Sequence, residues 1–118
     1  MNIRAIVIQE YISAYLDPIT LNKNEVVTVS HCDLEWQGWV WVFTASGQAG
    51  WAPQQLFTFQ PPNKALCRDN YTARELSVSL NEILILKKSL NGWFWAKKTS
   101  GESGWVPEAC ICLSELIC

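Results

Sequence analysis

The sequence has little of what catalysis or membrane insertion requires. Its 118 residues include a single histidine, and only 17% of them are charged. The adjacent His31 and Cys32 would point to opposite faces of a strand, so they could not act as base and nucleophile, and no enzymatic activity is expected. No apolar run is long enough to cross a bilayer, so no membrane partner is expected. The first residues lack a sustained apolar core with a cleavage site, which favours a cytoplasmic location.

An excess of basic charge is also missing. The formal net charge is −2 and the isoelectric point is near 5.3. A nucleic-acid-binding protein needs a basic face that neutralises phosphates. The lysine pairs at 87–88 and 97–98 lie near tryptophans and could form a stacking platform for single strands. We interpret them as solubilising charges, and no nucleic-acid partner is expected.

The five cysteines form no framework, because their number is odd and their spacing does not follow any repeat. Free thiols in a reducing compartment are the simplest interpretation. Cys110 and Cys112 would share one face of a strand, but two thiolates do not complete a zinc site. No metal and no cofactor are therefore expected.

One block of sequence occurs twice, and it holds six of the seven tryptophans. Trp39 and Trp93 are 54 positions apart, as are Pro53 and Pro107. The two copies read Gly-Trp-Val-Trp, then Gly-Trp-Ala-Pro, and Gly-Trp-Phe-Trp, then Gly-Trp-Val-Pro. A repeat with a fixed period indicates two copies of one small structural unit.

The local pattern is that of strands. Apolar and outward-facing residues alternate with a period of two, and no window shows a helical stripe. Gly47–Gly50 and Gly101–Gly104 are predicted hairpin turns. The fold class is therefore all-β, with two tandem five-stranded small barrels at residues 1–59 and 64–115. Residues 58–63, with Pro61-Pro62, are predicted to form a short stiff linker. The predicted core residues are Val27, Val29, Val42, Leu84, Leu86 and Ala96.

In order and repetition, these segments resemble the Src-homology 3 (SH3) family, and most closely its bacterial variants. The family opens with an Ala-Leu-Tyr-Asp-Tyr block and continues with Leu-Ser-Phe-x-x-Gly-Glu, before the Trp strand, Gly turn and Trp-x-Pro block. The segments that match the first two blocks are Val7–Tyr11, Cys67–Tyr71, Ile19–Glu25 and Leu76–Glu82. Asn24 and Asn81 replace the family Gly, and asparagine is the next-best residue for a left-handed turn.

The resemblance implies a protein that binds peptide or protein segments. In this family an extended segment, Pro-rich or basic, docks on aromatic ridges. The residues that match the groove are Tyr11, Trp39, Trp51 and Pro53 in the first copy, and Tyr71, Trp93, Trp105 and Pro107 in the second. Trp41 and Trp95 share the outer face of these grooves and would pack on each other or on the neighbouring domain.

The first copy is the expected ligand site, with Trp39 as its main anchor. Its two longer loops carry Trp36 and an acidic group made of Asp17, Asp33 and Glu35, with Glu10 nearby. These carboxylates would select an Arg or Lys in the ligand by charge-assisted hydrogen bonds, or would form a solvated acidic loop.

Three function classes remain open from the sequence. The first is an intracellular peptide-binding adaptor, and the second is a binder of bacterial cell-wall peptides. The third is a structural or assembly protein whose tryptophan faces are buried between domains or subunits. Ile83–Leu86 is apolar on both faces of its predicted strand, so we expect the two domains to pack together.

Overall fold

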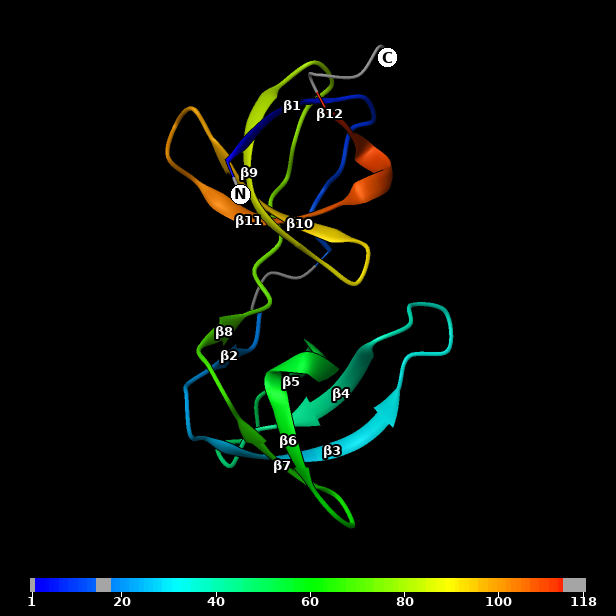
Figure 1. Ribbon diagram of the computed structural model, residues 1–118, viewed down its shortest axis with the longest axis vertical. Helices are drawn as coiled ribbons and strands as arrows, with labels where there is room; N and C mark the ends of the chain where they lie inside the picture. Colours follow the sequence, from blue (N-terminus) through cyan, green and yellow to red (C-terminus); the bar gives the residue numbers. More distant parts are fainter. Residues whose placement is uncertain (1, 15–17, 114–118) are drawn as a thin grey trace. The chain divides into compact units, whose positions relative to one another are not determined.

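The computed structural model describes residues 2–14 and 18–113. That part of the chain is all-β, with no α-helix and no helix that could span a membrane. It divides into two compact units. Unit 1 combines residues 1–16 with 74–118, and unit 2 is the contiguous segment 17–73. The chain therefore leaves unit 1 after its first strand, builds the whole of unit 2, and then returns (Figure 1).

Unit 1 is a five-stranded antiparallel sheet in the order β11-β10-β9-β1-β12. Strand β1 therefore lies between β9 and β12, although unit 2 separates it from both of them in the sequence (Figure 1). The elements of unit 1 are β1 (Ile3–Val7), β9 (Ile83–Leu90), β10 (Trp93–Lys98), β11 (Ser103–Pro107), the 3-10 helix η2 (Glu108–Cys110) and β12 (Ile111–Leu113).

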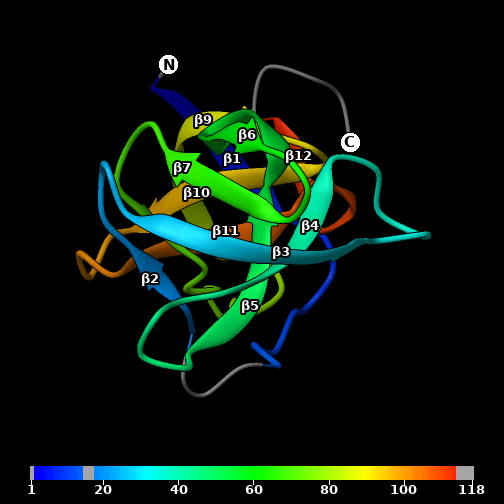
Figure 2. The same ribbon diagram turned by 90° about the horizontal axis from the view of Figure 1, so that it is seen from below.

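Unit 2 repeats this arrangement in the order β5-β4-β3-β7-β6, with β7 in the place that β1 has in unit 1. Figure 2 shows β3, β7 and β6 of unit 2 side by side. A short ladder, β2 with β8, completes unit 2. The elements of unit 2 are β2 (Thr20–Leu21), β3 (Val26–Cys32), β4 (Trp39–Phe43), β5 (Ala49–Pro53), the 3-10 helix η1 (Gln54–Leu56), β6 (Phe57–Gln60), β7 (Lys64–Cys67) and β8 (Tyr71–Thr72).

The all-β class with two small five-stranded units is confirmed, but the structure divides the chain differently from the boundaries 1–59 and 64–115. The predicted linker is also wrong. β6 and β7 pair antiparallel from Phe57↔Cys67 to Gln60↔Lys64, so residues 61–63 are the turn of a hairpin inside unit 2. Proline has no backbone N–H to donate to a neighbouring strand. It is tolerated in this turn because the turn residues are not part of the hydrogen-bonded ladder.

Strand β1, from the first repeat, lies in unit 1 with the strands of the second repeat, and β7, from the second repeat, lies in unit 2 with those of the first. The two strands make equivalent backbone hydrogen bonds. In each unit the last core residue of that strand bonds to the Asn-Glu turn that precedes the long central strand. The bonds are Val7 N–H to Glu82 O (2.9 Å) and Asn81 N–H to Val7 O (2.8 Å) in unit 1, and Cys67 N–H to Glu25 O and Asn24 N–H to Cys67 O (2.8 Å each) in unit 2.

The turns that the sequence predicted are present. Asn24 and Asn81 have φ angles of 73° and 70°, in the left-handed region where asparagine is tolerated. Gly47 and Gly101, in the two β-hairpin turns, have φ angles of 94° and 99°. A side chain at either glycine would be strained by the backbone angle rather than by a neighbour, since nothing lies within 4 Å of the added Cβ.

Each unit has its own hydrophobic core. Ala5 and Val7 on β1 are fully buried in unit 1, and Ala65 and Cys67 on β7 are fully buried in unit 2. The predicted core residues Val27, Val42, Leu84, Leu86 and Ala96 are all 0% exposed, and Val29 packs partly buried on the core of unit 2. Ile85, which was expected to be covered, is 36% exposed. Packing of the units against each other stays a prediction.

Cys32, Cys67 and Cys110 are free thiols, as expected. Cys112 is disulfide-bonded, so the expectation of free thiols is wrong for it. Burial, and after it the nearby charge of Glu25, raises the pKa of the Cys67 thiol to about 11. Burial also raises the pKa of Cys110. Both thiols are core residues that remain protonated at neutral pH, so neither is a nucleophile.

Candidate functional site

The structure regroups the aromatic residues that the sequence assigned to two sequential grooves. Tyr11 belongs to unit 1, where its ring meets the Trp93 ring edge to face, with centroids 5.8 Å apart and an interplanar angle of 81°. A backbone bridge joins Tyr11 to Val78, with hydrogen bonds of 3.0 and 2.8 Å. Across the ladder from Trp93 lies the buried Pro107. The aromatic pair of unit 1 therefore combines residues of both repeats, and the pairing of Tyr11 with Trp39, Trp51 and Pro53 is wrong.

A carboxylate lies beside this aromatic pair. The hydroxyl of Tyr11 donates a 2.6 Å hydrogen bond to Glu75 Oε1, and the N–H of Ala14 donates to the same oxygen at 3.1 Å. A bond of this length to an ionised group is among the stronger hydrogen bonds in proteins. Glu75 therefore holds the Tyr11 side chain in position beside Trp93 and places a negative charge next to these two rings. We call Tyr11, Glu75 and Trp93, with Pro107 beneath them, the Tyr11–Trp93 surface.

Sequence reasoning missed Glu75. A signal was available, since this residue comes directly before the block Leu76–Glu82 that carries the resemblance. The sequential division assigned Tyr11 to the other domain, so nothing brought this carboxylate next to an aromatic ring. The contact between Glu75 and Tyr11 follows from the position of β1 in unit 1.

The second tryptophan pair of unit 1 lies on the outer face of β10 and β11. Trp95 is opposite Trp105, with ring centroids 5.3 Å apart and an interplanar angle of 72°. Lys88 lies across from Trp95, and its Nζ is 5.6 Å from the centroid of the Trp105 ring, within cation–π range. A β-bulge at Lys87 on β9 gives Lys88 this position. Trp105 is only 3% exposed, so it supports its unit rather than offering a surface.

Unit 2 repeats this face with different partners. Trp41 is opposite Trp51, with ring centroids 5.1 Å apart. His31 takes the place of the lysine and contacts both rings, at 6.4 Å from Trp41 and 5.5 Å from Trp51. Phe43 extends the cluster, 6.5 Å from Trp41, and is 41% exposed. The outer tryptophans Trp41 and Trp95 thus each pack on a second tryptophan of their own unit, Trp51 and Trp105. Packing of either on the neighbouring domain stays a prediction.

Tyr71 belongs to unit 2, so its predicted grouping with Trp93, Trp105 and Pro107 is wrong. It is half-buried against the core of unit 2, and its hydroxyl donates a hydrogen bond of 3.2 Å to the carbonyl of Trp51.

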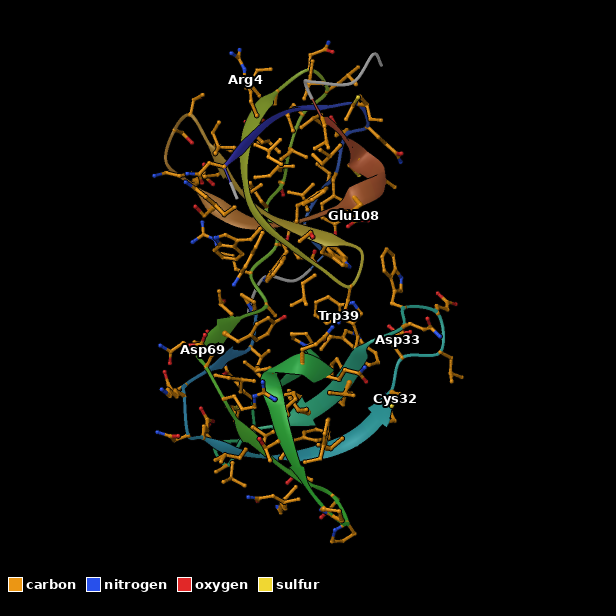
Figure 3. The ribbon with its side chains drawn as sticks, viewed as in Figure 1. Arg4, Cys32, Asp33, Trp39, Asp69 and Glu108 are labelled. Carbon is orange, nitrogen blue, oxygen red and sulfur yellow. The ribbon has the colours of Figure 1, made fainter. Side chains whose placement is uncertain are left out.

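Trp39, the expected main anchor, is only 7% exposed. It begins β4 opposite the fully buried Pro53 (Figure 3).

The acidic loop of the first copy is held by its own hydrogen bonds. Asp33, at the end of β3, accepts the backbone N–H groups of Glu35 at 2.9 Å and Trp36 at 3.2 Å (Figure 3). This geometry favours the interpretation of Asp33 as a turn-forming residue. Trp36 is 42% exposed and Glu35 is exposed. Glu10 is in unit 1 and so is not part of this group, and Asp17 lies outside the described residues.

The structure offers no group of three or more His, Cys, Asp or Glu side chains that could hold a metal ion within residues 2–14 and 18–113. The candidate functional side chains that the structure does bring together are aromatic rings with a single charged group beside them, as in Tyr11–Trp93 with Glu75 and Trp105 with Lys88.

Comparison with known families decides the class of the fold. Residues 4–60 match the family described as the variant SH3 domain. The chain contains an SH3-like domain. No curated protein and no solved structure matches the chain. SH3-type domains are in general non-catalytic modules of protein interaction, and this is the class that the match indicates.

The matched segment crosses the boundary between the two units. It begins on β1 in unit 1 and continues through β2 to β6 in unit 2. The match thus follows the order of the sequence, while in the structure β7 fills the first-strand position of unit 2.

Proposed function

We propose that the protein binds an extended peptide or protein segment on the Tyr11–Trp93 surface. The observation that carries this proposal is the edge-to-face pair of Tyr11 and Trp93 with the carboxylate of Glu75 on the tyrosine hydroxyl. Two half-buried aromatic rings form a ridge that favours a proline or another rigid, extended segment, because such a segment loses little entropy on binding.

The charge of Glu75 supports a ligand with a basic residue beside its apolar contact. The carboxylate accepts the bonds from Tyr11 and Ala14 on one oxygen, Oε1, and a carboxylate has about four acceptor positions on its two oxygens. An arginine or lysine of the ligand would make a charge-assisted bond there. The surface offers a ligand two aromatic rings and one carboxylate, so we expect an affinity in the micromolar range, about −8 kcal/mol.

A titration of a basic, Pro-rich peptide chosen from a peptide array tests the proposal. Replacing Trp93 with Ala removes the ridge and should weaken binding by about 30-fold, equivalent to about 2 kcal/mol. Glu75→Gln keeps the shape, and we expect it to weaken binding about 10-fold and to flatten its salt dependence. Amide NMR spectra of each variant verify that unit 1 is folded.

The matched control is Trp39→Ala, which removes the equivalent tryptophan of unit 2. It should change the affinity by less than about threefold, the effect of a residue outside the contact. Loss of binding in Trp39→Ala together with full binding in Trp93→Ala would contradict the proposal and place the ligand on unit 2.

A further inference from the structure

Strand β1 is held in unit 1 by its pairing with β9 and β12. The same pairing could form if β1 belonged to a different copy of the chain. Residues 3–6 pair with β9, and residues 5–7 pair with β12. Beyond the strand, Tyr11 bridges Val78, and the N–H of Ser13 donates to Ser77 Oγ at 2.9 Å. These contacts make residues 3–14 a continuous docking segment of unit 1. We call the position that it fills between β9 and β12 the first-strand site.

Unit 2 provides independent evidence that such a site accepts its strand whatever the connection. Its first strand, β7, is joined to unit 2 through the β6–β7 hairpin, whereas β1 reaches unit 1 only across the whole of unit 2. The two strands nevertheless make the same bonds to the Asn-Glu turn, and Ile8 and Arg68 make the same bond to the 3-10 helices. Those last bonds are Ile8 N–H to Cys110 O and Arg68 N–H to Leu56 O, both 2.8 Å.

We propose that a second copy of this chain can supply the first strand of unit 1, so that two chains exchange residues 3–14 and form a dimer with both units intact. Unit 2 is contiguous and needs nothing from β1. The exchanged dimer therefore has the same hydrogen bonds and the same buried residues as two monomers. Exchange of an identical element is a low-cost route to a dimer. The inference goes beyond the proposed function, since it concerns how the chain assembles and not what it binds.

Concentration decides between the two forms. Within one chain the tether holds β1 near its site at an effective concentration of the order of 1 mM. Mass action then predicts that about 1% of chains are dimeric at about 5 μM and about 40% at about 500 μM. Interconversion requires β1 to leave the centre of a sheet, so we expect it to be as slow as the unfolding of unit 1.

The first test is refolding of the full chain from denaturant at these two concentrations, followed by dilution and sizing by light scattering. A dimer that forms at the higher concentration and, after dilution, returns to monomer only on the timescale of the unfolding of unit 1 supports the proposal. A chain that stays monomeric at both concentrations, or a dimer that dissociates at once on dilution, would overturn it.

The second test identifies the exchanged strand. Arg4 on β1 is opposite Ile85 on β9, both side chains are exposed, and Arg4 extends outward (Figure 3). Residues opposite each other in an antiparallel pair are close enough for a disulfide. Chains with Arg4→Cys and chains with Ile85→Cys are refolded together, both with Cys32→Ser to remove the exposed native thiol. An intermolecular disulfide is expected.

A matched control replaces Ile85→Cys with Thr28→Cys. Thr28 lies opposite Lys64 on β7, so it occupies in unit 2 the place that Ile85 has in unit 1. Crosslinking of Arg4→Cys chains to Thr28→Cys chains, with none to Ile85→Cys chains, would mean that β1 enters unit 2 of its partner. That result would overturn the proposal.

Discussion

The two units are built alike, yet their chains are connected differently. Unit 2 is one contiguous segment, while unit 1 is assembled from two segments that unit 2 separates. Both have the same strand order and the same bonds between the first strand and the Asn-Glu turn. The structure of each unit is therefore determined by contacts within its sheet and not by the order of its strands along the chain.

The outer faces of the two units differ where their frameworks agree. Each has a pair of tryptophans across the same ladder, Trp95 with Trp105 and Trp41 with Trp51. Beside them unit 1 has the cation of Lys88, and unit 2 has the ring of His31. In addition, unit 1 has the Tyr11–Glu75 bond, whereas Tyr71 bonds to a backbone carbonyl. The paired tryptophans, which both units have, support the fold. The residues beside them differ between the units, so the two outer surfaces differ in charge.

The largest expected effect comes from a charge placed in the first strand. Ala5 and Ala65 are equivalent core residues, each 0% exposed, in unit 1 and unit 2 respectively. Ala5→Glu should unfold unit 1 and leave unit 2 intact, since burial of an unpaired carboxylate costs several kcal/mol. Ala65→Glu should do the reverse. Amide NMR signals assigned to each unit give the answer, and loss of unit 2 signals in Ala5→Glu would restore the sequential division.

The next effect concerns the stability of unit 2 at alkaline pH. The unfolded Cys67 thiol has a pKa of 9.0, and in the folded chain burial raises it to about 11. Between these values the unfolded chain loses a proton that the folded chain keeps, so stability is fully present below pH 9 and falls as the pH rises. We expect unit 2 to lose about 2 kcal/mol by about pH 10.5.

Cys67→Val provides the control for this pH effect, because unit 1 has Val7 at the same position. Urea unfolding at about pH 8 and about pH 10.5, analysed by linear extrapolation, gives the free energies of unfolding of the two proteins. An equal loss of stability in the wild type and in Cys67→Val would show that other groups cause the alkaline effect.

The tyrosines should differ more modestly. Tyr11→Phe removes a hydrogen bond to a carboxylate, and we expect it to lower the stability of unit 1 by about 1.5 kcal/mol. Tyr71→Phe removes a longer bond to a neutral carbonyl, and should cost unit 2 about 0.5 kcal/mol. Thermal unfolding followed by unit-specific NMR signals measures both. A larger loss in Tyr71→Phe would contradict the strength assigned to the Tyr11–Glu75 bond.

The smallest effect concerns the cation on the outer face of unit 1. Lys88→Gln removes the charge that lies 5.6 Å from the Trp105 ring, and should cost about 0.5 kcal/mol. Lys87→Gln is the control, because it changes the charge equally at the neighbouring bulge residue. Denaturant unfolding of both variants is the measurement. Identical losses would mean that net charge, and not the ring contact, is responsible.

Most of the local structure can be predicted from the sequence alone. The period of two predicted the strands, and the residues Val27, Val42, Leu84 and Leu86 lie in the cores as expected. Left-handed turns at Asn24 and Asn81 followed from residue chemistry, because few other side chains tolerate that backbone. The opposition of Trp39 with Pro53 and of Trp93 with Pro107 follows from hairpins whose turns are short and local.

Which first strand enters which unit, and with it the composition of the candidate site, depends on the packing of the whole folded chain. Ala5 and Val7 on β1 present the same small buried faces as Ala65 and Cys67 on β7. Both strands are then fixed by backbone hydrogen bonds, which are the same for every residue type and so leave no trace in the sequence. Tyr11 follows β1 to Glu75 and Trp93 because the chain connects them, and that choice of partner is a property of the folded chain as a whole.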